Sequence, residues 1–404
     1  MERKKKYRCW IIGGLILDLA VIIFLGYREL EKNIPDEIRV EKFQEFDLQE
    51  ICSCPFVEME NAVTVSKSNG YSVACELFGF IPYKTIKVIP ADREVLHVSG
   101  SCIGLYMETE GVLIIDAGEI VSREGIAQKP AENIVRPGDY IVAFNEEKVS
   151  TKHDLMEDLK YMNGEKVTLK VEREGKEIPL SITPVKDAEG NYKLGIWVRD
   201  DTQGIGSLTF IDQQGNYGAL GHGISDVDTG ELLKIHGGNL YGAEILGIQK
   251  GEKGNPGELS GLIYYETANV LGSIRENTSS GIYGRMSGNF MKTQKIELQQ
   301  MPIAYKQEIQ EGEASILCCV EDQVKEYQAE IKKIELNQQD TNKSFVIQVT
   351  DERLIKRTGG IIQGLSGSPI IQDGKLVGAV THVLVNDPTR GYGIFIENML
   401  TAAS

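Results

Sequence analysis

The hydrophobic pattern of the chain begins with one long apolar run from Cys9 to Gly26, interrupted only by Asp18. A run of this length lies near the lower limit for a helix that crosses a bilayer. Basic residues precede it, and basic flanks remain in the cytoplasm: Arg3, Lys4, Lys5, Lys6 and Arg8. The pattern therefore predicts a cytoplasmic flank at residues 1–8, a single-pass anchor at residues 9–26 in the cytoplasmic membrane, and an extracytoplasmic position for everything after Tyr27.

A cleaved signal peptide is the rival interpretation of this run. Such peptides end in a cleavage site made of small residues. The residues found here are the bulky sequence Leu25-Gly26-Tyr27-Arg28, so an uncleaved anchor is favoured. A buried core helix is disfavoured, because the run is terminal and basic residues flank one side of it.

The next two segments carry weaker patterns. Residues 27–59 are rich in charge and are predicted to form a linker, whereas residues 60–94 contain short strand-like runs and are predicted to form a small β region. One such run is Cys75 to Val88, which includes the sequence Leu-Phe-Gly-Phe-Ile-Pro.

Residues 95–186 have the pattern of one compact unit. Short apolar runs at 112–115 and 140–144 predict strands, and the alternation over 167–173 predicts a half-buried strand that turns at Gly175 into a hairpin. Between them, residues 151–161 predict an amphipathic helix with Leu155, Leu159 and Met162 on one face and Ser150 or Thr151 as its cap.

Residues 187–404 alternate between short apolar runs and turn signals. Runs at 207–211, 242–248, 345–349 and 376–383 predict strands, and glycine-rich or Asn-Asp-Pro turns separate them. Many short strands over this length favour a two-barrel or sandwich arrangement. We therefore expect a mainly β protein: a membrane helix, a compact domain at 95–186 and a β-rich domain at 187–404.

Composition removes two classes of function. The net charge is −16 at pH 7 with a pI near 5.0, which argues against nucleic-acid binding because phosphate recognition needs concentrated Lys and Arg. No C-x-x-C pair occurs, so neither a structural zinc site nor any other cofactor is predicted. The cysteines are expected to be apolar fillers or free thiols: Cys9, Cys52, Cys54, Cys75, Cys102, Cys318 and Cys319.

Two motifs make residues 95–186 similar to the PDZ domains attached to bacterial proteases. One is Ile103-Gly104-Leu105, an apolar-Gly-apolar loop whose N–H groups could bind a peptide carboxylate while the next strand edge accepts an added strand. The other runs from Pro130 through Pro137-Gly138-Asp139 to Asn145. The resemblance implies a peptide ligand at residues 103–105. The alternatives are a strand start that packs the core, or an unrelated small α/β domain.

The candidate nucleophile lies in Gly364-Leu-Ser366-Gly-Ser368-Pro, which resembles the nucleophile loop of chymotrypsin-like peptidases. Such a loop exposes one hydroxyl and directs two backbone N–H groups at a developing oxyanion, here those of Gly364 and Ser366. Ser366 is the preferred nucleophile. Ser368 is the rival hydroxyl, and a plain turn between strands is the alternative without chemistry.

A nucleophilic serine needs a general base, and the chain has five histidines. His222 is preferred, because it follows a predicted strand and is flanked by glycines that could project its ring into a cleft. His382 is expected to be a core or cleft-wall residue and His236 a surface residue; His97 and His153 lie in the PDZ-like unit. Candidates for the carboxylate that orients the base are Asp226, Asp228, Asp322, Asp340 and Asp351, of which Asp351 follows a predicted strand.

The whole chain resembles the stage IV sporulation protein B family of endospore-forming bacteria. The resemblance rests on the anchor, the Leu-Phe-Gly-Phe-Ile-Pro segment, the PDZ-like unit, Gly218-Ala-Leu-Gly-His222 and the block from Thr358 through Ser366 to the Asn386-Asp-Pro turn. It implies a trypsin-like serine peptidase at 187–404 with a triad of His222, Asp351 and Ser366. It also implies cleavage of a regulatory membrane protein between the forespore and mother-cell membranes, which releases processing of a late sigma-factor precursor.

A second class of function remains open at this point. A catalytically idle PDZ adaptor, which tethers membrane partners, would share the anchor and the peptide-binding unit. The presence of Ser366, His222 and Asp351 together favours the enzyme.

Overall fold

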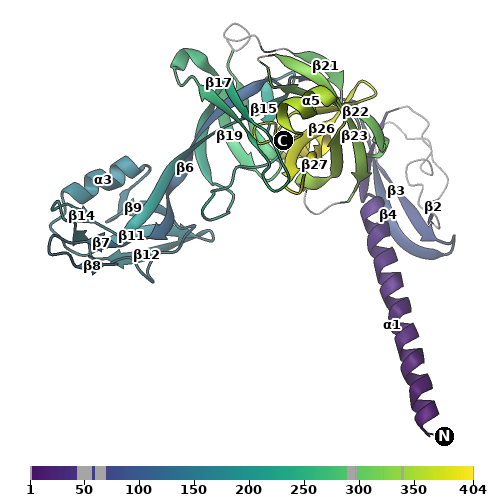
Figure 1. The fold of residues 1–404 in the computed structure, drawn as a ribbon, viewed down its shortest axis with the longest axis horizontal. Coiled ribbons are helices and arrows are strands. Elements are labelled where there is room, and N and C mark those ends of the chain that lie inside the picture. The colour runs from purple at the N-terminus through teal and green to yellow at the C-terminus, as the bar shows by residue number, and fades with distance from the viewer. Residues whose placement is uncertain are drawn as a thin grey trace.

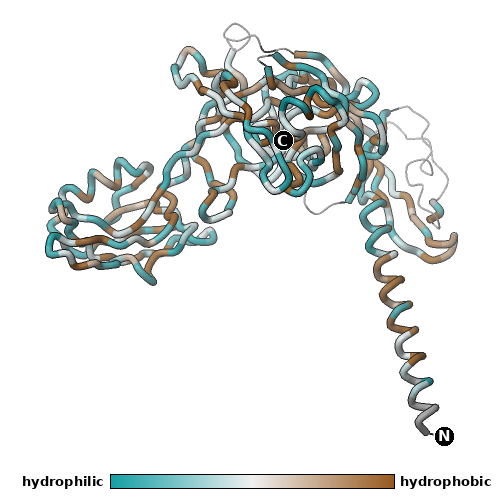
Figure 2. Tube along the Cα trace, viewed as in Figure 1, coloured by the Kyte–Doolittle hydropathy of each residue, from teal (hydrophilic) through white to brown (hydrophobic). Residues whose placement is uncertain are grey.

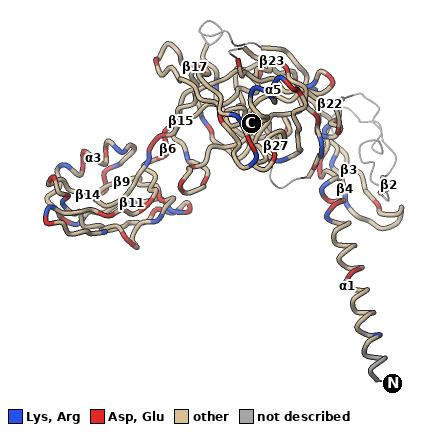
Figure 3. Tube along the Cα trace, viewed as in Figure 1, with Lys and Arg blue, Asp and Glu red and all other residues tan. Residues whose placement is uncertain are grey.

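The computed structural model describes residues 2–42, 57–59, 70–288, 296, 298–321, 323–337 and 341–403. The first helix, α1 (Glu2–Asn33), projects from the body of the molecule (Figure 1). Its segment Trp10–Asn33 is long and apolar enough to cross a membrane, and none of it is buried. Figure 2 shows apolar residues along much of this helix, and Figure 3 shows charged residues gathered where the helix joins the body. The chain therefore has one candidate membrane span among its described residues.

A small sheet lies where the helix meets the body. Its order is β1 (Glu37–Glu41), β4 (Ile81–Ala91), β3 (Tyr71–Leu77) and β2 (Val57–Met59), with β1 parallel to β4. Ile34, just beyond α1, packs with Ile38, Ile86 and Val88 in its core. The strand β1 lies within residues 27–59, the predicted linker, so part of that segment belongs to the small β sheet. Cys52 and Cys54 lie outside the described residues, and no disulfide joins the cysteines described with their side chains: Cys75, Cys102, Cys318 and Cys319.

The PDZ lobe is a curved sheet covered by one helix. The helix α3 (Lys152–Lys160) is capped by Thr151, which accepts the N–H of Asp154, while the Asp154 carboxylate accepts the N–H of Thr151. Leu155 is the buried anchor of the helix. The strands of the lobe are β7 (Ile120–Val121), β8 (Ala127–Gln128), β9 (Tyr140–Phe144), β10 (Glu147–Lys148), β11 (Val167–Arg173), β12 (Lys176–Ile182), β13 (Val185–Lys186) and β14 (Tyr192–Lys193).

Two long strands connect this lobe to the rest of the body. The strands β6 (Cys102–Ala117) and β15 (Ile196–Ile211) have 16 residues each and pair antiparallel from Ile196↔Ala117 to Ser207↔Cys102. Figure 1 shows them as an arm with the PDZ lobe at one end. Residues 196–198 of β15 line the PDZ lobe although they follow residue 186, and β5 (Val95–Val98) belongs to the main sheet although it lies within the predicted domain at 95–186.

The main sheet surrounds a core that includes Leu105, Leu208 and Tyr217. Beside β5, β6 and β15, it contains β16 (Asn216–Ala219), β17 (Ile235–Gln249), β18 (Glu258–Ile263), β19 (Val270–Thr278), β20 (Gly281–Met286) and β21 (Gln299–Pro302), with the short helix η1 (Thr267–Asn269). The sequence predicts a two-barrel or sandwich arrangement for residues 187–404. In the described chain, the first half of these residues belongs to one continuous sheet, because β6 and β15 extend that sheet into the PDZ lobe.

The C-terminal half closes into a barrel. Its order is β22 (Gly312–Cys319), β23 (Val324–Ile334), β24 (Phe345–Val349), β27 (Asp387–Phe395), β26 (Lys375–Leu384) and β25 (Pro369–Gln372). The short helices are η2 (Lys306–Glu308), η3 (Thr341–Lys343), α5 (Glu352–Thr358) and α6 (Ile396–Ala402). A mainly β protein with an N-terminal apolar helix and a C-terminal barrel is confirmed.

Candidate active site

The nucleophile loop joins α5 to β25 and is held by hydrogen bonds from two sides. Gly364 and Gly367 have φ of 96° and 90°, which side chains with a β-carbon rarely adopt. The N–H of Ser207 on β15 donates to the carbonyl of Ser366 at 2.9 Å, and the N–H of Gly367 donates to the carbonyl of Val380 on β26 at 2.8 Å. The loop therefore lies between the main sheet and the barrel.

The two serines of this loop have different surroundings. Ser366 is partly exposed, and its hydroxyl donates to the carbonyl of Thr381 at 2.8 Å. Ser368 is completely buried, and its hydroxyl lies 3.3 Å from that of Ser207. A nucleophile must reach a substrate carbonyl, so the geometry favours Ser366 over Ser368.

The backbone of the loop leaves two N–H groups free. The N–H groups of Leu365, Gly367 and Ser368 donate to backbone carbonyls. In the part of the chain that the structure describes, those of Gly364 and Ser366 have no hydrogen-bond acceptor. Unpartnered, neighbouring N–H groups on both sides of a reactive serine are what an oxyanion hole requires. This arrangement agrees with the predicted pair.

His222 follows β16 on a backbone of unusual conformation. Leu220 and Gly221 both have positive φ, 66° and 68°. The ring nitrogen Nδ1 lies 2.8 Å from the carbonyl oxygen of Gly223. A carbonyl can only accept, so Nδ1 carries the proton and Nε2 keeps the lone pair of a general base. The Gly223 carbonyl therefore fixes the tautomer that catalysis needs.

A second imidazole lies against the first. The ring centroids of His222 and His382 are 4.6 Å apart and the rings are tilted by 35°. His382 follows Thr381, whose carbonyl accepts the Ser366 hydroxyl. Within the described residues, Nδ1 of His382 is buried without a hydrogen-bond partner. His382, expected to be a core or wall residue, is thus a direct neighbour of the candidate base.

Both rings are held neutral by their surroundings. Burial lowers the pKa of His222, although the bond to Gly223 acts in the opposite direction. Burial, and then the proximity of His222, lower the pKa of His382 to about 4. Neutral imidazole is the form that accepts a proton, so the base remains competent at neutral pH.

The lowered pKa of His382 predicts a loss of stability in acid. Its folded-state value, about 4, lies below the ordinary 6.5. Between these pH values the unfolded chain binds a proton that the folded chain does not, so the stability present above pH 6.5 is lost as the pH falls. The melting temperature of wild type should therefore fall more than that of His382→Leu between pH 7 and pH 4.5. His236→Leu, which removes an exposed ring, is the control, and equal pH responses of wild type and His382→Leu would refute the effect.

Asp351 lies elsewhere in the described structure. It caps α5 and accepts both the backbone N–H and the guanidinium of Arg353, the latter at 2.7 and 3.0 Å, and the N–H of Gln328 at 3.2 Å. Arg353 foremost lowers the pKa of Asp351 to about 2. Among the described residues, no hydrogen bond joins Asp351 to His222. The structure therefore places His222 beside His382, the residue after the Thr381 carbonyl that accepts the Ser366 hydroxyl, and places Asp351 with Arg353.

Among the described residues, no hydrogen bond joins Asp226 or Asp228 to His222 either. Asp226 is buried, pairs with Arg199 and accepts the N–H groups of Asp228 and Thr229, and Asp228 also pairs with Arg199. Asp322 and Asp340 lie outside the described residues. No cluster of three or more potential metal ligands occurs in the described part of the chain.

A cavity of about 680 Å³ begins at the nucleophile loop. Gln363 and Gly364 form one end, and the cavity extends between β15 at residues 203–205 and β18. Its lining is mixed, with Ile205, Leu259 and Ile263 beside polar side chains such as Glu258. An extended chain held at Ser366 could pass into this cavity.

The predicted peptide loop at Ile103-Gly104-Leu105 does not lie at a free edge. Gly104 pairs with Ile205 of β15 on one side and with Tyr241 of β17 on the other, and Ile103 and Leu105 are buried. A peptide strand cannot be added there. The apolar-Gly-apolar triplet is instead the interior of a central strand, and this part of the prediction needs correction.

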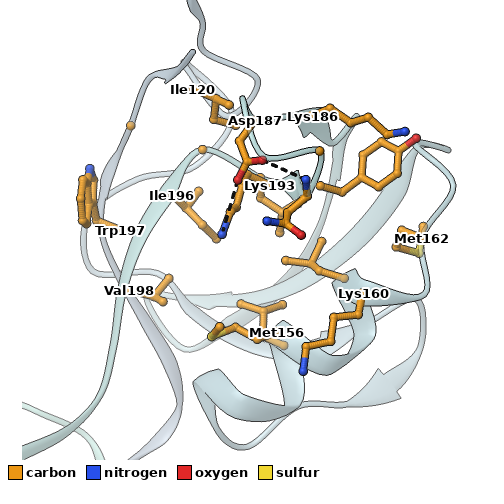
Figure 4. A pocket seen from close by; sticks show the side chains of 18 of the residues that line it. Ile120, Met156, Lys160, Met162, Lys186, Asp187, Lys193, Ile196, Trp197 and Val198 are labelled. Atoms are coloured by element: carbon orange, nitrogen blue, oxygen red, sulfur yellow. Dashed lines mark hydrogen bonds and ion pairs between the residues drawn. The ribbon is translucent and has the colours of Figure 1, made fainter. Parts of the chain in front are cut away.

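The groove of the PDZ lobe lies at a different triplet, Leu194-Gly195-Ile196. A cavity of about 1000 Å³ separates α3 from residues 194–198 (Figure 4). Gly195 has φ of 68°, and β6 is the strand paired with residues 196–207 of β15 in the described chain. This triplet is a second apolar-Gly-apolar motif in the sequence, but it lies beyond residue 186, the predicted end of the PDZ domain.

Two protein families match this chain, one on each side of residue 186. The family described as SpoIVB peptidase S55 matches residues 190–400, and the PDZ domain family matches residues 102–183. Two solved structures, the PDZ domains of SdrC-like proteins from Listeria monocytogenes and Listeria innocua, match 22% of this chain at 16% and 22% identity. The matches cover 87% and 94% of those chains, with TM-scores of 0.18 and 0.19.

Proposed function

The chain belongs to the SpoIVB peptidase S55 family, and from this premise we propose that it is a membrane-anchored serine endopeptidase that uses Ser366 and His222. The observation that carries the proposal is the partly exposed Ser366 hydroxyl in a loop with two unpartnered N–H groups, together with a neutral imidazole at His222. Its extracytoplasmic position rests on the candidate span and the basic flank before it.

The proposed reaction is acyl transfer. Nε2 of His222 takes the proton of the Ser366 hydroxyl as the oxygen attacks the substrate carbonyl, and the N–H groups of Gly364 and Ser366 bind the oxyanion. The resulting imidazolium returns the proton to the leaving amine, and water then releases the acyl group. Before attack, the Ser366 hydroxyl must exchange the Thr381 carbonyl for His222.

The resemblance adds Asp351 as the third catalytic group. This role requires its carboxylate to exchange Arg353 for the ring of His222. The proposed triad predicts that Asp351→Asn lowers kcat by about 10⁴. Asn caps a helix about as well as Asp, so α5 should remain intact, and loss of the ion pair with Arg353 should lower the melting temperature by a few degrees.

Steady-state kinetics and thermal melts of Asp351→Asn and Arg353→Ala test this assignment. Arg353→Ala removes the competing guanidinium and should keep activity. If Asp351→Asn lowers kcat by less than about tenfold, Asp351 does not orient His222, and the Gly223 carbonyl is the group that holds the ring.

The biological role proposed from the resemblance is cleavage of a regulatory membrane protein during sporulation. Cleavage in the space between the forespore and mother-cell membranes would release processing of a late sigma-factor precursor. The test is replacement of the wild-type gene by Ser366→Ala in the sporulating host. The precursor should accumulate unprocessed although the variant is present at the wild-type level.

The competing proposal is a PDZ adaptor without catalysis. The groove of about 1000 Å³ beside α3 favours it, since that groove alone could tether a partner. Normal precursor processing with Ser366→Ala, and loss of processing with a groove variant such as Met156→Glu, would establish the adaptor instead.

A further inference from the structure

One strand connects the two sites. Residues 194–198 line the PDZ groove at the start of β15, and residues 203–205 line the cavity at the nucleophile loop. Ser207, two residues further, donates its N–H to Ser366. The PDZ groove and the candidate active site therefore open along the same strand.

The edge of β15 next to the active site is free to accept a partner. Ser207 directs its N–H to Ser366 and its carbonyl to the N–H of Leu220, away from β6. Alternate residues of a strand direct their backbone N–H and C=O groups to the same edge, so those of Ile205 and Gln203 also point away from β6. In the described residues no strand pairs with that edge at 203–205, and the cavity lies there.

The charge of the PDZ groove fixes the direction of a bound chain. Four lysines line it, of which Lys193 pairs with Asp187 and Lys152 with Asp200 and Asp201. In the described chain this leaves Lys160 and Lys186 without an ion pair (Figure 4). Lys186 lies over the ring of Tyr192, 4.9 Å from its centroid. The cations of this lining, together with the Leu194-Gly195-Ile196 turn at its edge, favour a terminal carboxylate at the start of β15. A chain that ends there runs antiparallel to β15, and its upstream residues lead toward Ser366.

We propose that a single substrate chain occupies both sites, with its C-terminal carboxylate at residues 194–196 and its scissile bond at Ser366. The proposal rests on the peptidase function and adds a substrate class: proteins with an extended, accessible C-terminal segment. The chain direction of the substrate is the same at both sites. Residues C-terminal to the scissile bond would run antiparallel to β15, past Ile205 and Gln203, toward the groove.

The strand also sets a minimum length. From Gly195 to Ser207 there are twelve residue steps (207 − 195), which span at most about 40 Å at about 3.3 Å per residue. An extended substrate needs about the same number of residues to reach from the groove to Ser366. Bonds closer to the C-terminus cannot be cut while the carboxylate is bound.

Binding tests the proposal without catalysis. Random-sequence peptide pools of 24 and 8 residues, each with a free carboxylate or an amide at the C-terminus, are passed over the immobilised full-length Ser366→Ala protein. Because two linked contacts raise affinity, the 24-residue pool with a free carboxylate should be retained at least tenfold better than its amide or than either 8-residue pool.

Matched variants in the Ser366→Ala background assign the two contacts. Met156→Glu places a negative charge in the groove, whereas Tyr161→Glu places one on an exposed residue just beyond α3. Gln203→Pro removes an N–H from the free edge, whereas Gln203→Ala keeps it. Met156→Glu and Gln203→Pro should each abolish the length advantage, and the two controls should preserve it.

Cleavage by the active protein supplies the second measurement. Mass spectrometry of the 24-residue free-carboxylate pool should find cuts about twelve or more residues from the C-terminus. Retention without a length or carboxylate preference, or cuts spread evenly along the peptides, would overturn the proposal while leaving the peptidase intact. The expected retention pattern with no cleavage by wild type would instead reject the peptidase and keep the two-site binding.

Discussion

Ser366→Ala should reduce proteolysis by about 10⁴ to 10⁶ while leaving the fold intact, because the chain then lacks the oxygen that attacks the substrate. The hydroxyl makes one recorded hydrogen bond, to the carbonyl of Thr381, and is partly exposed. Losing a bond of this kind costs about 1 kcal/mol, so the melting temperature should fall by only a few degrees. Kinetics with an unstructured protein substrate, together with thermal melts, measure both effects.

Ser368→Ala is the matched control for the nucleophile. Its buried hydroxyl faces that of Ser207, so removal leaves Ser207 without this partner and should cost about 1 to 3 kcal/mol of stability. Activity per folded molecule should stay within about tenfold of wild type. Activity retained by Ser366→Ala and lost by Ser368→Ala would reverse the assignment.

His222→Ala should cause the second large loss, about 10⁴ or more in kcat. The ring is held by the Gly223 carbonyl in the tautomer that leaves Nε2 free to accept a proton. Alanine removes the base but leaves Ser366 and its two free N–H groups in place. The pH profile of the residual activity should lose the limb that reports the imidazole.

His382→Ala separates the two neighbouring rings. His382 packs on His222 and does not hold the Ser366 hydroxyl itself, so its removal should keep substantial activity. His236→Ala, at an exposed position, should also keep it. Equal losses from His222→Ala and His382→Ala would mean that the pair of rings acts as one unit.

The local elements were predictable because their signals are local. The helix α3 begins at its predicted cap Thr151, and its buried face carries Leu155. The loop around Ser366 was recognisable because Gly364 and Gly367 occupy backbone conformations that few residues tolerate. In each case a few adjacent residues determine the geometry.

The longer-range features could not be read from the pattern. The apolar alternation of β6 is the same whether one edge or both are paired, so Ile103-Gly104-Leu105 resembled a peptide-binding loop although β15 and β17 flank it. The Leu194-Gly195-Ile196 turn lies beyond residue 186, and its place beside α3 depends on the pairing of β15 with β6, which no local pattern predicts. The ion pair of Asp351 with Arg353 was not predictable either, because the sequence does not show where the Arg353 side chain lies.

The most direct test of the central claim is covalent labelling with a fluorophosphonate. The reagent reacts with a serine that is activated by a base and an oxyanion hole, and it requires no knowledge of the substrate. Peptide mapping by mass spectrometry should place the label on Ser366 in wild type, with little or none in Ser366→Ala or His222→Ala. A label on Ser368 or elsewhere, or no label on wild-type protein that cleaves substrate, would contradict the assignment of Ser366 as the nucleophile.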